Sequence, residues 1–154
     1  MKKTTTLILL LLCLNSYSQN PKIEYENFKL LESKEIIWQK VFEINSTNDS
    51  IVQLLKSFTS KSSFLNNLKY NNYTFSGRSN FRKISNMKGL AIAVRTDFDC
   101  FIKIEVKESK YRVSISNIKF KPINIDAGMI EMNTNFVLED IVVRNNHNEI
   151  RKNK

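Results

Sequence analysis

The sequence predicts an α+β fold, in which one antiparallel sheet of about five strands carries one helix packed on one face. Several short segments alternate apolar and polar residues, which is the period of a half-buried strand. One segment instead repeats its apolar residues at helical spacing. The order along the chain is strand, helix and then four strands, and strands that follow one another in this way form an antiparallel meander beside a helix.

Length and composition limit the classes of protein. The chain has 154 residues, 42% of them hydrophobic and 25% charged, which fits one globular domain. One His and two Cys cannot build a His-rich metal site or a disulfide scaffold. Lys and Arg number 24 against 15 Asp and Glu, so the formal net charge is +9.

Residues 1–18 have the layout of a secretory signal peptide. Lys2 and Lys3 precede an apolar run over 7–14, and Ser-Tyr-Ser then places small residues before a cleavage site at Gln19. The apolar run is shorter than the ~20 residues that a membrane span needs. We therefore expect an exported protein, periplasmic or secreted, at a bacterial cell envelope. An uncleaved, membrane-associated start is the alternative.

Cleavage changes the charge and the cysteine count of the mature chain. It removes Lys2 and Lys3, two of the nine net charges, and leaves +7. It also removes Cys13, so that Cys100 is the single thiol and no internal disulfide forms. The chain then divides into a signal peptide (1–18), a polar leader with a weak helical tendency (19–34), an α+β domain (35–125) and a partly disordered C-terminal tail (126–154).

The domain begins with a predicted strand and the predicted helix. Over residues 36–44 the apolar side chains occupy even positions, interrupted by Lys40, which favours a strand. Candidates for the N-cap are Ser46, Thr47, Asn48 and Asp49, and Ser46 and Asp49 also have the spacing of a capping box. The helix should run from about Asp49 to Ser62. Its buried stripe is expected to contain Ile51, Leu54, Leu55 and Phe58.

Two further strands are predicted before the best-defined hairpin. Residues 70–81 favour one strand with a bulge near Gly77. Residues 85–89 form a turn, and residues 90–94 alternate as the next strand. A three-residue connection at Asp97-Phe98-Asp99 then leads into the hairpin.

The hairpin is predicted with its register. A two-residue turn at Glu108-Ser109 places apolar residues on one side and sets Glu105 opposite Arg112 on the other. The apolar cross-strand pairs are Val106 with Tyr111, Ile104 with Val113, and Ile102 with Ile115.

The end of the domain and the tail carry fewer signals. A change of parity predicts a bulge near Ser116-Asn117, and Pro122 ends the last strand. In the tail, Leu138, Ile141 and Val142 indicate a short helix. Residues 144–154 are expected to be solvated and disordered.

The hairpin segment IKIEVKESKYR (102–112) resembles a family of unknown function with a TBP-like fold, found in secreted proteins of Gram-negative bacteria. The family hairpin reads hydrophobic-x-hydrophobic-x-Val-Lys-Asp-Gly-[Arg/Lys]-Tyr-Arg. The resemblance covers about residues 35–123 and implies a TBP-like fold without catalytic residues.

Two departures separate this chain from the family. Glu108-Ser109 replaces Asp-Gly, which suits a type I′ turn, so a longer connection or another turn type is expected here. The family also carries a second helix after its last strand. The residues before Lys154 contain no convincing counterpart, so the chain resembles a shortened member.

Candidate catalytic and metal-binding residues have simpler structural interpretations. His147 lies in the polar tail, where nothing holds it beside a nucleophile. Asp97 and Asp99 could pair as carboxylates, but a polar turn is preferred because no calcium-type loop surrounds them. Cys100 is expected to be a buried thiol. We expect no enzyme, no metal and no cofactor.

Basic residues provide the binding candidates. Their surface could bind anionic headgroups or an anionic surface polymer, and Glu105 interrupts it. Alternatively, the excess of positive charge reflects a general bias in composition and not a binding function, because the chain is also rich in Asn and Ile. The candidates are Arg78, Arg82, Lys83, Lys103, Lys107, Lys110 and Arg112.

These observations predict an exported, non-catalytic binding or interaction module of the cell envelope. Its partner is an envelope protein or an anionic surface polymer, while the export signal disfavours nucleic acid. The sheet face opposite the helix is the expected contact surface if it is open. A structural, self-associating envelope protein is the alternative, and an envelope enzyme ranks third.

Overall fold

A computed structural model describes residues 24–83, 96–122, 136–144 and 149–151 of the chain. The predicted signal peptide, the turn at 85–89, the strand at 90–94 and His147 lie outside these residues. Within the described part, no helix is long and apolar enough to cross a membrane.

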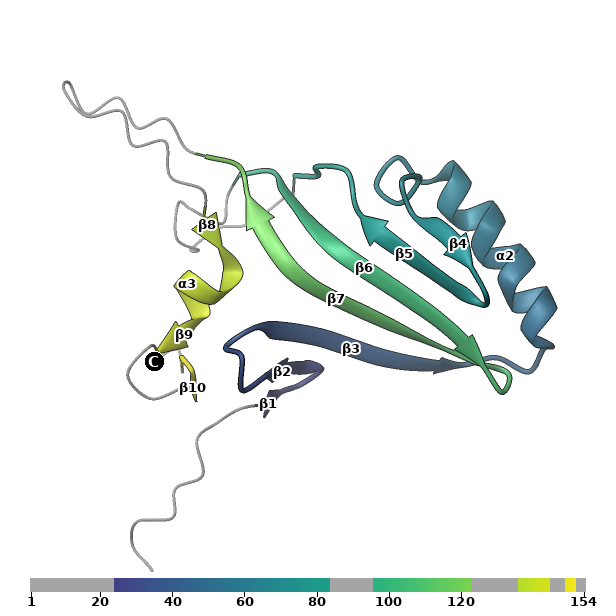
Figure 1. Ribbon diagram of the computed structural model, residues 1–154, viewed down its shortest axis with the longest axis horizontal. Coiled ribbons are helices and arrows are strands. Elements are labelled where there is room, and N and C mark those ends of the chain that lie inside the picture. Colours follow the sequence, from purple (N-terminus) through teal and green to yellow (C-terminus); the bar gives the residue numbers. More distant parts are fainter. Residues whose placement is uncertain (1–23, 84–95, 123–135, 145–148, 152–154) are drawn as a thin grey trace, which may run out of the picture.

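The architecture is an antiparallel sheet in the order β1-β2-β3-β7-β6-β5-β4, with β8 paired to the end of β7 (Figure 1). Helix α2 lies at the β4 end of this sheet, and α3 lies beside β8. The predicted α+β class is confirmed, with eight strands in place of about five. The elements are β1 (Glu24–Tyr25), β2 (Phe28–Leu30), β3 (Ile36–Glu43), α2 (Asn48–Lys61), β4 (Lys69–Asn71), β5 (Thr74–Arg78), β6 (Phe98–Lys107), β7 (Lys110–Phe120), β8 (Phe136–Val137), α3 (Leu138–Val142), β9 (Val143–Arg144) and β10 (Glu149–Ile150).

The leader and the tail are more ordered than the sequence indicates. The helical tendency of the leader is wrong, because β1 and β2 extend the sheet beyond β3. The disorder of the tail is wrong for β9 and β10, which pair with each other. A small core joins the two ends, since buried Leu30 packs with Ile36 and Val143, and Ile150 lies against them. The short helix of the tail is confirmed as α3.

Helix α2 is confirmed, but its buried face differs from the prediction. The N-cap is Thr47, one of the four predicted candidates, and its Oγ1 accepts a hydrogen bond from the Ser50 N–H at 3.3 Å, so the Ser46–Asp49 capping box is wrong. Val52 is buried while Leu54 and Phe58 are 62% and 61% exposed. The remaining inward positions are Ile51, Leu55 and Thr59.

Two tyrosines explain why α2 is rotated about its own axis relative to the predicted orientation. The Tyr73 hydroxyl donates to Asp49 Oδ1 at 2.8 Å, and Lys56 Nζ lies 4.2 Å from the centre of the Tyr70 ring. The helix flank that carries Asp49 and Lys56 therefore faces the β4–β5 hairpin. Leu54 and Phe58 lie on the other flank, away from this hairpin.

The single strand predicted over 70–81 is wrong, because a turn divides it into β4 and β5. Asn72 and Tyr73 both have positive φ, 41° and 57°, which is the backbone of a type I′ turn. The bulge near Gly77 is also wrong, since β5 pairs with β6 without a break. Gly77 serves a close approach instead: a Cβ there would lie 3.1 Å from the Asn67 carbonyl oxygen.

The β6–β7 hairpin confirms the predicted register, including the Glu105–Arg112 pair. The two-residue turn forms with φ of 52° at Glu108 and 58° at Ser109, so the expected change of turn type is wrong. Tertiary contacts offset the missing glycine: the Ser109 N–H donates to Asn48 Oδ1 at 2.9 Å, and the Ser109 carbonyl accepts from the Ile44 N–H.

The far end of the hairpin holds a bulge and a longer strand than predicted. The register shifts between Asp99 and Phe101, where Asn117 on β7 has a φ of 50°, so the predicted bulge is confirmed. The predicted connection at Asp97-Phe98-Asp99 is wrong, because β6 already begins at Phe98. The main core lies between α2 and the sheet and contains Ile51, Val52, Phe75, Cys100, Ile102, Ile104 and Val106.

Candidate functional site

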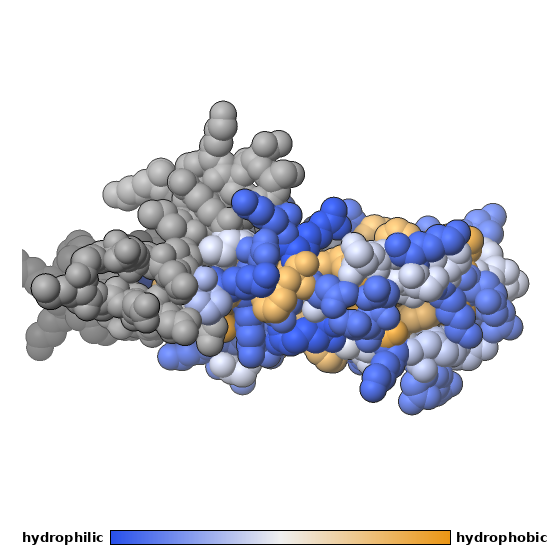
Figure 2. Space-filling model, turned by 90° about the horizontal axis from the view of Figure 1, so that it is seen from above, coloured by the Kyte–Doolittle hydropathy of each residue, from blue (hydrophilic) through white to orange (hydrophobic). Residues whose placement is uncertain are grey.

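The sheet face opposite α2 is polar and carries most of the predicted basic residues. Because the buried side chains of β6 alternate with more exposed ones from Cys100 to Lys107, the pairing register extends this assignment to the neighbouring strands. Seen from above the view of Figure 1, the described surface is largely hydrophilic, with small, separate hydrophobic patches (Figure 2). We call the sheet face opposite α2 the open face; it consists of Gln39, Val41, Glu43, Thr74, Ser76, Arg78, Phe101, Lys103, Glu105, Lys107, Lys110, Arg112, Ser114 and Ser116.

Glu105 is the centre of an ion network on the open face. Its carboxylate lies 2.8 Å from Lys103 Nζ and 2.7 Å from Arg112 Nη2. Hydrogen bonds from Lys103 and Arg112 lower the pKa of Glu105 below its usual value. The two cations are therefore held close together by one carboxylate.

The turn end of the open face holds two more ion pairs. Lys110 Nζ lies 2.7 Å from Glu43 Oε1, and this contact raises the pKa of Lys110 and lowers that of Glu43. Lys107 pairs with Glu108 at 3.1 Å. The four predicted hairpin cations are thus brought together on one face, and each has a carboxylate partner.

Arg78 and Arg82 do not share one surface. Arg78 lies on the open face, where it pairs with Asp99 and donates to Asn117 Oδ1 at 3.1 Å. Arg82 is bridged to Phe98, whose side chain faces the core, and its guanidinium lies 5.9 Å from the Phe64 ring centre. Lys83 follows Arg82 in an exposed position. The open face therefore includes Arg78 alone from this group.

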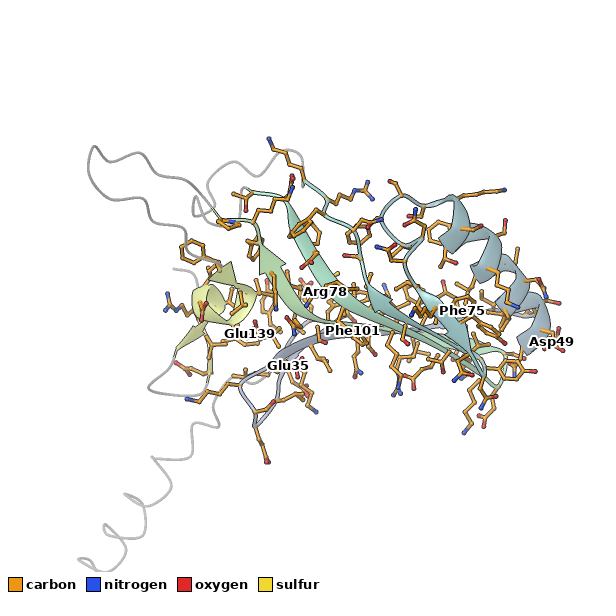
Figure 3. The ribbon with its side chains drawn as sticks, turned by 45° about the horizontal axis from the view of Figure 1, so that its top comes forward. Glu35, Asp49, Phe75, Arg78, Phe101 and Glu139 are labelled. Atoms are coloured by element: carbon orange, nitrogen blue, oxygen red, sulfur yellow. The ribbon has the colours of Figure 1, made fainter. Side chains whose placement is uncertain are left out.

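Two exposed apolar residues of the open face were missed by sequence reasoning. Val41 is 54% and Phe101 is 41% exposed. Figure 3 shows Phe101 near Arg78, and the two residues are cross-strand partners in β6 and β5. The signal was available, because Phe101 has the same parity as Lys103 and Glu105 in the sequence.

We predict that Glu105→Gln removes a pH-dependent contribution to stability. Because the folded pKa of Glu105 is lowered, this contribution is present above the ordinary glutamate value of about 4.3 and is lost as pH falls through the lowered value. The variant should lose no more than about 1 kcal/mol at pH 7, since the pair is near the surface. Urea unfolding at several pH values measures the difference, which should shrink toward zero in acid. A difference that is constant with pH would contradict the prediction.

Asp97 and Asp99 do not form a carboxylate pair. Lys121 Nζ lies 2.8 Å from Asp97 Oδ2, whereas Asp99 is buried and pairs with Arg78. The polar-turn interpretation fails for Asp99, which lies within β6. Among the residues that the structure describes, no group of three or more His, Cys, Asp or Glu could hold a metal ion.

Cys100 is buried, as predicted, at 1% exposure. Its N–H donates to Ser79 Oγ at 3.0 Å, and burial raises the pKa of its thiol. A thiol in this environment is a poor nucleophile. The position fits packing better than catalysis.

We predict that Cys100 reacts with a thiol reagent only when the domain opens. In a Cys13→Ser background, modification should be at least about a hundredfold faster in denaturant than in buffer, because the native thiol must be exposed by opening. Mass spectrometry of iodoacetamide-treated protein measures the rate. Equal rates in the two conditions would show that the thiol is accessible in the native state.

The fold and its open face can be compared with those of known proteins. The chain is similar to the crystal structure of a TBP-like protein from Parabacteroides distasonis ATCC 8503, with a TM-score of 0.54 and 18% sequence identity. The match covers 76% of this chain and 74% of that chain. No family model matches the sequence, and no curated protein matches it. The likeness shows the fold alone: the chain has a TBP-like α+β fold, as the hairpin motif implied.

Proposed function

We propose that the protein is an exported, non-catalytic binding module of the cell envelope that contacts an anionic surface polymer through its open face. The open face is the observation that supports this function most directly. It places Arg78, Lys103, Lys107, Lys110 and Arg112 along one polar surface. The Ser76 and Ser116 hydroxyls and the Gln39 amide add hydrogen-bonding groups along this surface.

The ion pairs define what kind of ligand this surface can bind. Glu43, Glu105 and Glu108 partly neutralise the neighbouring cations. A single small anion would have to compete with these carboxylates, whereas a polymer can contact several cations at once. Exposed Phe101 offers an apolar contact for the backbone of such a polymer. The predicted signal peptide supports the location. The shifted pKa values are explained by ion pairing, hydrogen bonding or burial and need no catalytic role.

The experiment compares two variants with the same change of charge on dextran sulfate. One variant replaces Lys103, Lys107 and Lys110 of the open face by Gln. The control replaces Lys34, Lys56 and Lys61, none of which belongs to the open face, by Gln. The open-face variant should elute from the column at lower salt than the control, because binding follows the contacted cations. Equal shifts for the two variants would support the compositional origin of the charge and overturn the proposal.

A further inference from the structure

Strand β3 is longer than the strand on its outer side. It pairs with β7 from Trp38 to Glu43, but with β2 only from Ile36 to Trp38. Figure 1 shows the second half of β3 running past the end of β2. Within the described residues, the outer edge of β3 is therefore uncovered from Lys40 to Glu43.

The backbone hydrogen bonds show which groups face outward. The Ile44 N–H donates to Ser109 next to β7, whereas the Gln39 N–H donates to the Asn27 carbonyl on the outer side at 2.9 Å. Because backbone groups alternate along a strand, the N–H and C=O groups of Val41 and Glu43 also face outward. No described residue forms a backbone hydrogen bond with these outward-facing groups. Such groups form a template for one more strand.

We propose that this edge, Lys40–Glu43, binds an extended peptide of another protein as an added antiparallel strand, with an acidic side chain opposite Lys40 and an apolar side chain opposite Phe42. Lys40 and Phe42 occupy the outer edge at non-hydrogen-bonded positions, where facing side chains approach most closely. Lys40 is exposed, and its Nζ lies 5.4 Å from the centre of the Phe42 ring. Lys40 faces Val113 on β7, so it has no acidic cross-strand partner there. A carboxylate opposite Lys40 on an added strand forms a favourable cross-strand pair.

A second copy of the chain fits this edge poorly. Two copies carry the same net charge of +9. A twofold pairing centred on Val41 needs the Gln39 N–H, which already donates to Asn27. A pairing centred on Phe42 sets Lys40 opposite Ile44 of a second copy, so Lys40 gains no acidic partner. Lys40 thus disfavours self-pairing and favours an acidic strand.

The test is an NMR titration of the ¹⁵N-labelled protein, expressed from its full sequence, with the capped peptide Thr-Lys-Val-Thr-Glu-Thr. In antiparallel register this peptide sets Val opposite Phe42 and Glu opposite Lys40. We expect saturable shifts at the Val41 and Glu43 amides, and hydrogen exchange there slowed about tenfold at saturation. The composition-matched peptide Thr-Glu-Val-Thr-Lys-Thr should bind roughly two- to fivefold more weakly.

Two variants separate strand addition from general charge attraction. Val41→Pro removes an outward N–H and no sheet hydrogen bond, so the domain should fold and lose peptide binding. Val41→Thr keeps the N–H and should bind like the original protein. Lys40→Glu should abolish the preference between the two peptides, because each peptide then places one opposite-charge pair and one like-charge pair at positions 40 and 43.

Several results would overturn the proposal. One is saturation that maps away from β3. Another is that a peptide N-methylated at the amides that face β3 binds as well as the unmodified peptide. This readout stands even if Val41→Pro does not fold. Val41 and Glu43 amides already protected in a concentration-dependent dimer would assign the edge to a second copy instead.

Discussion

Phe75→Ala should cost about 3–5 kcal/mol of the free energy of unfolding, the range for removing a large aromatic side chain from a core. Phe75 is 2% exposed and lies in the cluster that joins α2 to the sheet. It pairs across strands with Ile104, and its ring lies 4.9 Å from that of Tyr70, so truncation leaves a cavity between helix and sheet. A domain of this size has about 5–15 kcal/mol of stability in total, so the loss is large. Urea denaturation followed by circular dichroism measures it as a lowered midpoint.

Phe58→Ala on α2 is the matched control. The same side chain is removed, but Phe58 is 61% exposed, and its loss should change stability by less than about 0.5 kcal/mol. The helix stripe predicted from the sequence instead makes Phe58→Ala costly as well, because it places Phe58 inside. A costly Phe58→Ala beside a mild Phe75→Ala would contradict the observed rotation of α2.

The sequence was most informative where two local signals constrained the same choice. In the β6–β7 hairpin, the alternation of apolar residues and the length of the turn both specify the register, so Ile104 opposite Val113 followed directly. The existence of α2 was equally clear from its period. The rotation of α2 about its axis was not clear, because two sets of residues satisfy helical spacing equally well. The predicted set is Ile51, Leu54, Leu55 and Phe58, and the observed set is Ile51, Val52, Leu55 and Thr59. The contacts that decide between them come from Tyr70 and Tyr73, which are distant in sequence.

Local patterns could not predict the shortest elements or the ion pairs between residues that are distant in sequence. Strands β1, β9 and β10 have two residues each, too few to show a period. Their neighbourhood depends on long-range contacts such as the Ile36 N–H donating to Glu139 Oε1 at 2.9 Å. On the open face, the sequence likewise predicted which face a residue occupies but not its distant partner. The parity of Lys110 placed it on the correct face, but its partner Glu43 lies 67 positions away.

Arg78→Ala should destabilise the domain by about 1–3 kcal/mol, because it leaves a buried carboxylate without its charged partner. Asp99 is 8% exposed, and the guanidinium of Arg78 binds both this carboxylate and the Asn117 side chain at the β7 bulge. The single variant therefore loses an ion pair and the contact that ties the bulge to β5. Guanidinium chloride unfolding at pH 7 measures the change.

A double-mutant cycle identifies the cause of this loss. If the unpaired carboxylate carries most of the cost, Arg78→Ala combined with Asp99→Ala should be less destabilised than the sum of the two single variants. Arg112→Ala is the matched control, because it removes the same side chain from an ion pair near the surface and should cost less than about 1 kcal/mol. Additive single variants, or equal losses at Arg78 and Arg112, would mean that burial of Asp99 does not make its pair special. The cycle thus separates an arginine that stabilises the bulge from arginines that only contribute charge to the open face.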